Sequence, residues 1–182
     1  LNTPLRDHKG SIFEGGVRAA AFANWPGRIP AGQRIAEPMH IIDWYPTFVR
    51  LAGGTLEGSG PIDGKDVWPM LTEKAPSPHD FILSAHSPRK AALRVGNWKL
   101  VLQPAEAEAE AEGKARNKGK GKGKGKAADA AETVALYDLA NDPGEATSLA
   151  DREPERVAEL RAKLEGLLKE AVPSGADAVG AD

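Results

Sequence analysis

The sequence Ala-Ala-Leu-Arg-Val-Gly-Asn-Trp-Lys-Leu-Val-Leu, residues 91–102, decides how the second half of this 182-residue chain folds. Two short β-prone runs flank Gly96 and Asn97, and such a dipeptide between apolar runs is typical of a tight hairpin turn. A further β-prone run, Thr-Val-Ala-Leu-Tyr-Asp-Leu, occupies residues 133–139, and Phe-Ile-Leu-Ser-Ala at 81–85 is another strand candidate. We therefore expect antiparallel strands in this half of the chain.

A low-complexity segment, residues 104–131, separates two of these runs. It alternates Glu with Ala and then Gly with Lys, and it contains seven basic and five acidic residues. Its only apolar side chains are alanines, so it cannot contribute to a hydrophobic core. The simplest prediction is a long loop between two antiparallel strands, which is tolerable because closure entropy grows only with the logarithm of loop length.

The strongest helix signal covers residues 153–171. An apolar stripe with helical spacing runs along it and predicts the face that packs on the sheet. We expect Asp151 to cap its N-terminus and Pro173 to end it. The stripe consists of Val157, Leu160, Leu164, Leu167 and Leu168.

The first half of the chain predicts a mixture of strand and helix. A small apolar run at residues 17–25, ended by a Pro-Gly turn, predicts a buried strand. Asp43 is expected to cap a short helix over residues 44–52, and residues 66–71 predict one or two further helical turns. The apolar face expected for the short helix contains Tyr45, Phe48, Val49 and Ala52.

Composition excludes several classes of protein. With 41% apolar residues, 27% charged residues and a formal net charge of −2, the chain suits one or two globular domains without a global field for polyanions. The absence of cysteine excludes disulfide scaffolds, thiol nucleophiles and cysteine-ligated zinc. No run of about 18 apolar residues predicts a transmembrane helix.

Individual residues carry little chemical signal. No serine lies in a G-x-S-x-G context, and Asp-Leu-Ala-Asn-Asp-Pro-Gly-Glu at 138–145 predicts a turn rather than a calcium loop. The histidines show neither HxH nor HExxH spacing, which favours ordinary structural roles over metal binding. They are His8, His40, His79 and His86.

The order of longer motifs is far more informative. In chain order these are NTPLRDHKGSIFEGGVR at 2–18, WPG at 25–27, MHIIDWYPT at 39–47, DG at 63–64 with WPML at 68–71, VGNWKL at 95–100, and LYDLANDPGE at 136–145. This series resembles the sulfatase family in order and spacing. The resemblance covers nearly all of residues 1–171 apart from the low-complexity segment.

The resemblance implies an α/β fold in two parts. Residues 1–75 would be the end of a large alkaline-phosphatase-like α/β domain. Residues 76–182 would be a small C-terminal domain, an antiparallel sheet packed with a C-terminal helix, and would carry the loop 104–131. The chain would then be the C-terminal portion of a longer protein, with the upstream remainder of that protein as its partner.

The resemblance also implies the chemistry of the complete protein. Sulfatases hydrolyse sulfate esters with a formylglycine made from a C/S-x-P-x-R motif and with a divalent cation, usually calcium, on Asp and Asn ligands. This sequence contains no cysteine and no S-x-P-x-R, and the family's late Asp-Asn ligand pair would precede residue 2. We therefore expect no metal ligand in this chain and no activity from the chain alone.

One active-site residue is carried over by the resemblance. Lys9 is expected to be a catalytic and substrate-binding residue that contacts the sulfate, where a fixed ammonium would stabilise developing negative charge. Glu14 and Arg18 are expected to hold the loop that follows Lys9. No catalytic role is expected for His8, and Asp43 matches a helix cap.

Two other interpretations stay open beside the leading one. The chain could be a non-catalytic module that binds polyanions through its Lys/Gly-rich segment, or part of a related hydrolase of phosphate or phosphonate esters. The leading hypothesis is hydrolysis of a sulfated small molecule or sulfated glycan, that is, of aryl or carbohydrate sulfates. Membranes and nucleic acids are not expected partners, and the resemblance implies a periplasmic or secreted location.

Overall fold

The computed structural model describes residues 2–87, 89–105 and 131–171. The chain divides into two units by its internal contacts. One unit joins Leu1–Arg18 to Leu83–Asp182, and the other is Ala19–Ile82. The sheet and the segment that carries Lys9 therefore belong to the same unit.

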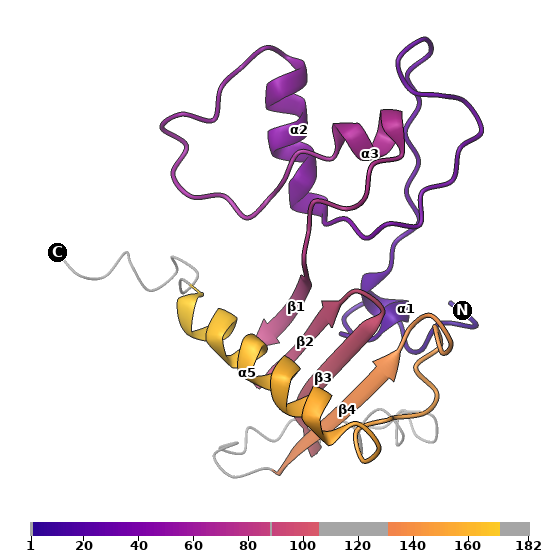
Figure 1. Ribbon diagram of the computed structural model, residues 1–182, viewed down its shortest axis with the longest axis vertical. Coiled ribbons are helices and arrows are strands. Elements are labelled where there is room, and N and C mark those ends of the chain that lie inside the picture. The colour runs from indigo at the N-terminus through magenta and orange to yellow at the C-terminus, as the bar shows by residue number, and fades with distance from the viewer. Residues whose placement is uncertain (1, 88, 106–130, 172–182) are drawn as a thin grey trace, which may run out of the picture. The chain divides into compact units, whose positions relative to one another are not determined.

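A four-stranded sheet organises the first unit (Figure 1). Its strand order is β1 (Ile82–Ser87), β2 (Lys90–Val95), β3 (Trp98–Pro104) and β4 (Glu132–Asp138). The pairs β2–β3 and β3–β4 are antiparallel. Gly96 turns the β2–β3 hairpin with a φ of 57°, a region that glycine enters without steric cost. The predicted hairpin and the predicted strands at 81–85 and 133–139 are confirmed.

The strands on either side of the low-complexity segment pair with one another. Leu100 lies opposite both Leu93 and Leu136, and the β3–β4 register continues to Pro104 opposite Glu132. Beyond them the Ala105 N–H donates to the Ala131 carbonyl over 2.8 Å. The segment thus joins two antiparallel strands, as predicted, and its residues 106–130 lie outside the described ranges.

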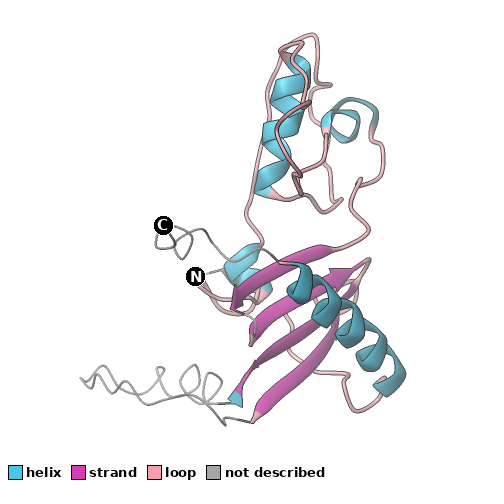
Figure 2. Cartoon of the chain, turned by 90° about the vertical axis from the view of Figure 1, so that its left-hand side faces the viewer, coloured by secondary structure: helices cyan, strands magenta, loops and turns pink. Residues whose placement is uncertain are grey.

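Helix α5 (Pro154–Glu170) packs against β2 and β3 on one face of the sheet (Figure 2). Strand alternation directs Leu93, Leu100 and Leu136 to that face, and all three are fully buried. From the helix, Leu160 and Leu164 complete this layer. Full burial of each leucine contributes about 2 kcal/mol.

The start of α5 differs from the prediction. Glu153, not Asp151, is the N-cap residue, and its side chain makes no capping hydrogen bond. The N–H groups of Arg152 and Glu153 both donate to the Leu149 carbonyl, so a tight turn separates Asp151 from the helix. The predicted end at Pro173 lies outside the described residues.

The opposite face of the sheet is covered by the N-terminal segment and its short helix α1 (Glu14–Val17) (Figure 2). Ile12 and Phe13 are the apolar residues that this segment inserts. Together with the sheet they form one buried cluster. Its other members are Ala92, Val101, Ala135, Tyr137 and Leu139.

The unit Ala19–Ile82 contains η1 (Ile41–Asp43), α2 (Trp44–Leu51) and α3 (Trp68–Glu73). The helices predicted at 44–52 and 66–71 are confirmed. The buried strand predicted at 17–25 is wrong, because residues 18–25 are exposed and adopt no regular structure. A strand requires hydrogen-bonding partners, and within the described ranges no strand pairs with this segment.

The exposed side of α2 also differs from the prediction. Tyr45 and Phe48 are 54% and 58% exposed, whereas Pro46 and Thr47 are buried. Polar contacts decide which face is buried, because Thr47 Oγ1 donates to the Asp43 carbonyl and accepts from the Val67 N–H. The proposed division of a longer protein at residues 1–75 and 76–182 stays a prediction.

Shortening the low-complexity segment tests its connection to the strands. Replacing residues 106–130 by an Asn-Gly turn between Ala105 and Ala131 should leave the free energy of unfolding unchanged or raise it by up to about 2 kcal/mol, because a shorter loop costs less closure entropy. Urea denaturation followed by circular dichroism measures this. A Gly-Ser segment of the original length is the control and should match the parent. Loss of the sheet in the shortened chain would contradict the loop assignment.

Candidate functional site

A buried ion cluster lies on the face of the sheet that α1 covers. The Nζ of Lys99, on β3, lies 2.9 Å from Oε1 of Glu14 and 2.8 Å from Oε1 of Glu145. The backbone N–H of Glu14 donates to Oε2 of Glu145 over 2.5 Å. The exposed fractions are 2% for Lys99, 4% for Glu14 and 0% for Glu145. One ammonium therefore bridges two carboxylates that come from opposite ends of the described chain.

The position of Lys99 in the strand explains why its charge is buried. Lys99 lies opposite Tyr137 and shares a face with Val101, so its side chain enters the layer beneath α1. Removing an ammonium from water costs several kcal/mol unless close partners compensate. The two glutamates provide this compensation, and they hold the segments that carry them against β3.

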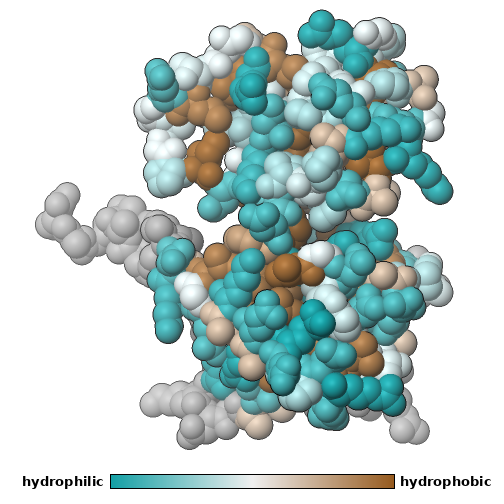
Figure 3. All heavy atoms as spheres, viewed as in Figure 1, coloured by the Kyte–Doolittle hydropathy of each residue, from teal (hydrophilic) through white to brown (hydrophobic). Residues whose placement is uncertain are grey.

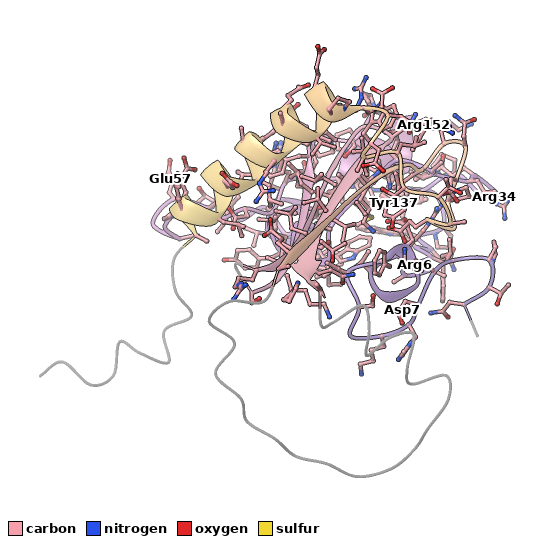
Figure 4. The ribbon with its side chains drawn as sticks, turned by 90° about the horizontal axis from the view of Figure 1, so that it is seen from below. Arg6, Asp7, Arg34, Glu57, Tyr137 and Arg152 are labelled. Atoms are coloured by element: carbon pink, nitrogen blue, oxygen red, sulfur yellow. The ribbon has the colours of Figure 1, made fainter. Side chains whose placement is uncertain are left out.

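Arg6 makes a second polar contact between the N-terminal segment and the sheet. Its Nη1 donates to the Tyr137 hydroxyl over 2.8 Å and to the Glu145 carbonyl over 3.3 Å. Its guanidinium carbon also lies 3.9 Å from the centre of the Phe13 ring, a cation–π contact. Figure 4 shows Arg6 beside Tyr137, with Asp7 following it on the loop.

Two glycines determine how closely this loop approaches α1. A Cβ on Gly15 would lie 2.3 Å from the carbonyl oxygens of Arg6 and Asp7. On Gly16 it would lie 2.3 Å from the carbonyl oxygen of Ser11. No side chain larger than hydrogen fits at either position, so the Gly-Gly pair lets residues 6–11 fold tightly around the start of the helix.

Lys9 lies at the exposed tip of this loop. Gly10 follows it with a φ of 92°, a conformation that favours glycine. The neighbouring His8 pairs its Nδ1 with Oδ1 of Asp7 at 2.7 Å, and 84% of its side chain is exposed. Lys9 is thus presented to solvent by a backbone that is held in place on its buried side.

The sequence predicted part of this site. Glu14 was expected to be structural, and its burial against Lys99 confirms that. Arg18, largely exposed, reaches only 3.9 Å from Glu14. The roles of Lys99 and Glu145 were missed, although a lysine inside the apolar run Trp-Lys-Leu-Val-Leu is itself a signal that a buried partner exists.

Asp43 organises a separate polar network in the unit Ala19–Ile82. It is fully buried, and its Oδ1 lies 2.8 Å from Nε2 of His79 and accepts the Lys65 N–H over 3.0 Å. Its Oδ2 accepts the His40 N–H over 2.6 Å, which completes a capping box around η1. Asp43 occupies the N-cap position of α2, as predicted, but its side chain makes no capping hydrogen bond to that helix. Its carboxylate instead accepts from His40 and Lys65 and contacts His79.

Residues 2–87, 89–105 and 131–171 contain no group of three or more His, Asp or Glu side chains that could hold a metal ion. In the same part of the chain, no helix is both long enough and apolar enough to cross a membrane.

Comparison with known proteins identifies the family. No family model matches the chain. Arylsulfatase J of Mus musculus is 30% identical over 195 residues, which cover 94% of this chain and 33% of the relative. Steryl-sulfatase of Mus musculus is 33% identical over 150 residues, covering 79% of this chain and 24% of the relative. The chain belongs to the sulfatase family. It spans a third or less of the length of these curated relatives.

Solved structures give the same result for the fold of this sulfatase chain. Ps i-CgsB in complex with k-i-k-neocarrahexaose superposes with a TM-score of 0.67 and 25% identity, over 92% of this chain and 32% of that one. A Bacteroides thetaiotaomicron protein from work on glycosaminoglycan metabolism superposes with a TM-score of 0.66 at 21% identity, over 91% and 32% of the two chains. The predicted α/β fold, with its small antiparallel sheet and C-terminal helix, is confirmed.

The buried ion cluster of Lys99, Glu14 and Glu145 affects the protonation of Glu145. Burial raises the pKa of the Glu145 carboxyl above its usual value of 4.5, and the Lys99 ammonium opposes this only in part. A raised pKa in the folded state means that the fold retains a proton that the unfolded chain has already lost. The part of the stability that comes from this retained proton is therefore fully present below about pH 4.5 and is lost as pH rises through the folded-state pKa.

This pH dependence can be measured by comparison with Glu145→Gln, which cannot titrate. From about pH 4.5 towards neutrality, the free energy of unfolding of the parent should fall relative to that of the variant. Urea denaturation at a series of pH values gives this difference. Glu155→Gln, at an exposed position of α5, is the control and should run parallel to the parent. A parent curve that stays parallel to Glu145→Gln, or rises relative to it, would contradict the assigned direction.

Proposed function

We propose that this chain is the C-terminal portion of a sulfatase that hydrolyses sulfate esters, with Lys9 contacting the sulfate group. The observation that supports this most strongly is the placement of Lys9. Its ammonium is exposed at the tip of a loop whose backbone rests on Gly15 and Gly16. A cation that is accessible to a ligand but attached to a fixed backbone suits recognition of an anion.

The chemistry of sulfate ester hydrolysis explains why such a cation is useful. As the bond between sulfur and the ester oxygen breaks, negative charge increases on the sulfate oxygens and on the leaving oxygen. An ammonium already in place stabilises this charge without reorganising at the moment of reaction. When the ammonium lies about 4 Å from one such negative charge, at an effective dielectric constant near 20, their attraction is worth on the order of 4 kcal/mol before desolvation costs.

The nucleophile and the metal are assigned to the remainder of the protein. The sequence has no C/S-x-P-x-R motif for formylglycine, and the described residues offer no cluster for calcium. We therefore assign no step through either group to residues of this chain. The part played by this chain is to present Lys9 on a loop held by Gly15 and Gly16.

The exposed side chains of the unit Ala19–Ile82 support the proposal that further polypeptide packs against it. Phe22 is 95% exposed, and the aromatic side of α2 leaves Tyr45 and Phe48 more than half exposed. Apolar side chains at the surface of this unit are visible in Figure 3. Apolar surface that gathers in patches is typical of an interface, and the match to this chain covers a third or less of the curated relatives. We propose that the preceding part of the sulfatase covers this surface.

Two substrate classes stay within the proposal. The names of the relatives favour aryl and steryl sulfates, whereas Ps i-CgsB was solved with a bound oligosaccharide. Carbohydrate sulfates are therefore an equal candidate. Binding of polyanions by the Lys/Gly-rich segment stays a separate prediction, since that segment lies outside the described residues. Action on phosphate or phosphonate esters and a periplasmic or secreted location also stay predictions.

The role of Lys9 is tested in the complete protein. Lys9→Ala should lower kcat/KM for a sulfate ester by roughly 10²–10³, the effect of removing one preorganised charge-stabilising group. The melting temperature should not change, because Lys9 is exposed. Lys169→Ala, which removes an exposed lysine from the last turn of α5, is the matched control and should retain full activity. Unchanged kinetics in Lys9→Ala would show that Lys9 is only a surface charge.

The 182-residue chain alone should hydrolyse no aryl sulfate, because it lacks the nucleophile motif. It should also bind no calcium tightly, because its described residues contain no cluster of metal ligands. A chromogenic sulfate ester assay and calcium titration calorimetry measure these two properties. Turnover that a chelator abolishes would contradict the proposal that this chain is an incomplete portion of the enzyme.

A further inference from the structure

We propose that Lys99, Glu14 and Glu145 are positioning residues for Lys9, because their buried ion cluster holds the loop of residues 6–11 against the sheet. This inference rests on the proposed function, in which Lys9 contacts the sulfate. The three cluster residues are at most 4% exposed, so they act through the backbone rather than by touching substrate. This one positioning role would explain three separate motifs of the sequence: Glu-Gly-Gly, Trp-Lys-Leu and Asp-Pro-Gly-Glu.

The first step of the argument concerns helix α1. This helix has only four residues, too few to be stable by itself, so its position must come from tertiary contacts. Glu14 provides them at both its ends. Its N–H donates to Glu145, 131 positions away, and its carboxylate accepts from Lys99, 85 positions away. Both hydrogen bonds are buried, and they attach the start of α1 to the sheet unit at two points.

The second step connects α1 to Lys9. The Gly15 N–H donates to the Arg6 carbonyl over 2.8 Å, and the backbone of residues 6–7 lies directly against the Gly15 Cα. Gly16 lies against the chain on both sides of Lys9, next to the carbonyls of His8 and Ser11. The chain before and after Lys9 thus rests on two adjacent glycines. Any shift of α1 moves both supports together.

The third step explains why charged groups, and not apolar groups, fix the position of α1. A buried ion cluster seldom adds more net stability than apolar side chains of the same volume, so stability is a weak reason for it. Hydrogen bonds between charged groups do, however, specify direction and distance more strictly than apolar contacts. That strictness matters for a catalytic cation, since a misplacement of about 1 Å can lower a rate by about 10²-fold.

The test is a set of double variants in the complete sulfatase. Lys99→Met removes the ammonium at similar side-chain length, and Glu145→Gln removes one charge while keeping an acceptor for the Glu14 N–H. Each should lower kcat for a sulfate ester by about 10-fold to 10²-fold, with a smaller change in KM. In a Lys9→Ala background, either variant should lower kcat by no more than about 2-fold further, since the positioned group is already absent.

A matched control separates positioning from general damage. Arg161→Met also removes a cation, one that pairs with Glu132 and Glu165 at the surface of the same unit. It should leave kcat unchanged in both backgrounds. Effects of Lys99→Met and Glu145→Gln that simply add to the effect of Lys9→Ala would overturn the proposal, because the cluster would then act on stability alone.

Amide hydrogen exchange in the 182-residue chain gives a readout independent of activity. Exchange at Gly15 and Ser11, whose N–H groups donate to Arg6 and His8, should accelerate at least about 10-fold in Glu145→Gln, while exchange at Leu100 in β3 stays slow. If Lys99→Met unfolds the chain, the near-isosteric Glu145→Gln decides. Unchanged exchange at Gly15 and Ser11 would overturn the inference. Normal activity of Lys9→Ala would instead overturn the proposed function and, with it, the catalytic purpose of the cluster.

Discussion

The contact on which the first unit depends is the Lys99 ammonium between the carboxylates of Glu14 and Glu145. An ammonium on the inner face of a central strand can be accommodated only if anionic partners reach it, because desolvation of an isolated charge is too costly. Glu14 comes from the N-terminal segment and Glu145 from the loop after β4. Because the buried ammonium of one lysine needs anionic partners, three distant parts of the sequence meet on the same face of the sheet.

The two faces of this sheet are stabilised by different forces. On the α5 side, Leu93, Leu100 and Leu136 meet Leu160 and Leu164, and the energy comes from burial of apolar surface. On the α1 side, Ile12 and Phe13 provide apolar contacts, but directional hydrogen bonds determine how the segment is placed. A nonspecific layer thus supports the sheet, and a specific layer presents the loop that carries Lys9.

The unit Ala19–Ile82 follows a different pattern, with polar groups buried beside Val67, Met70 and Leu71 and with aromatic groups outside. Asp43 accepts hydrogen bonds from the backbone of His40 and Lys65 and contacts the His79 ring, so three loops converge on one carboxylate. The aromatic side of α2 is left in solvent. Exposed aromatic side chains of this kind support the proposal that preceding polypeptide completes the unit.

The sequence alone determined the elements whose signals are local. The Gly96-Asn97 turn, the β-prone runs beside it and the apolar spacing of α5 depend on neighbours within a few residues, so the hairpin, the strands and the helix could be predicted. The order of the motifs was enough for the family, and Glu14 was correctly expected to be structural. The strand expected at 17–25 failed because a strand exists only through its pairing partners, and no strand in the described part of the chain pairs with this segment. Asp43 was correctly placed at the start of α2, but the contacts of its carboxylate could not be predicted, because Lys65 and His79 are 22 and 36 positions away. Only the tertiary structure could decide that Lys99 joins Glu14 and Glu145, since the identity of an ion partner depends on which strand faces which loop. Local sequence sets the conformation of each segment, whereas buried charge is satisfied across segments, and that is why the support beneath Lys9 becomes visible only in the folded chain.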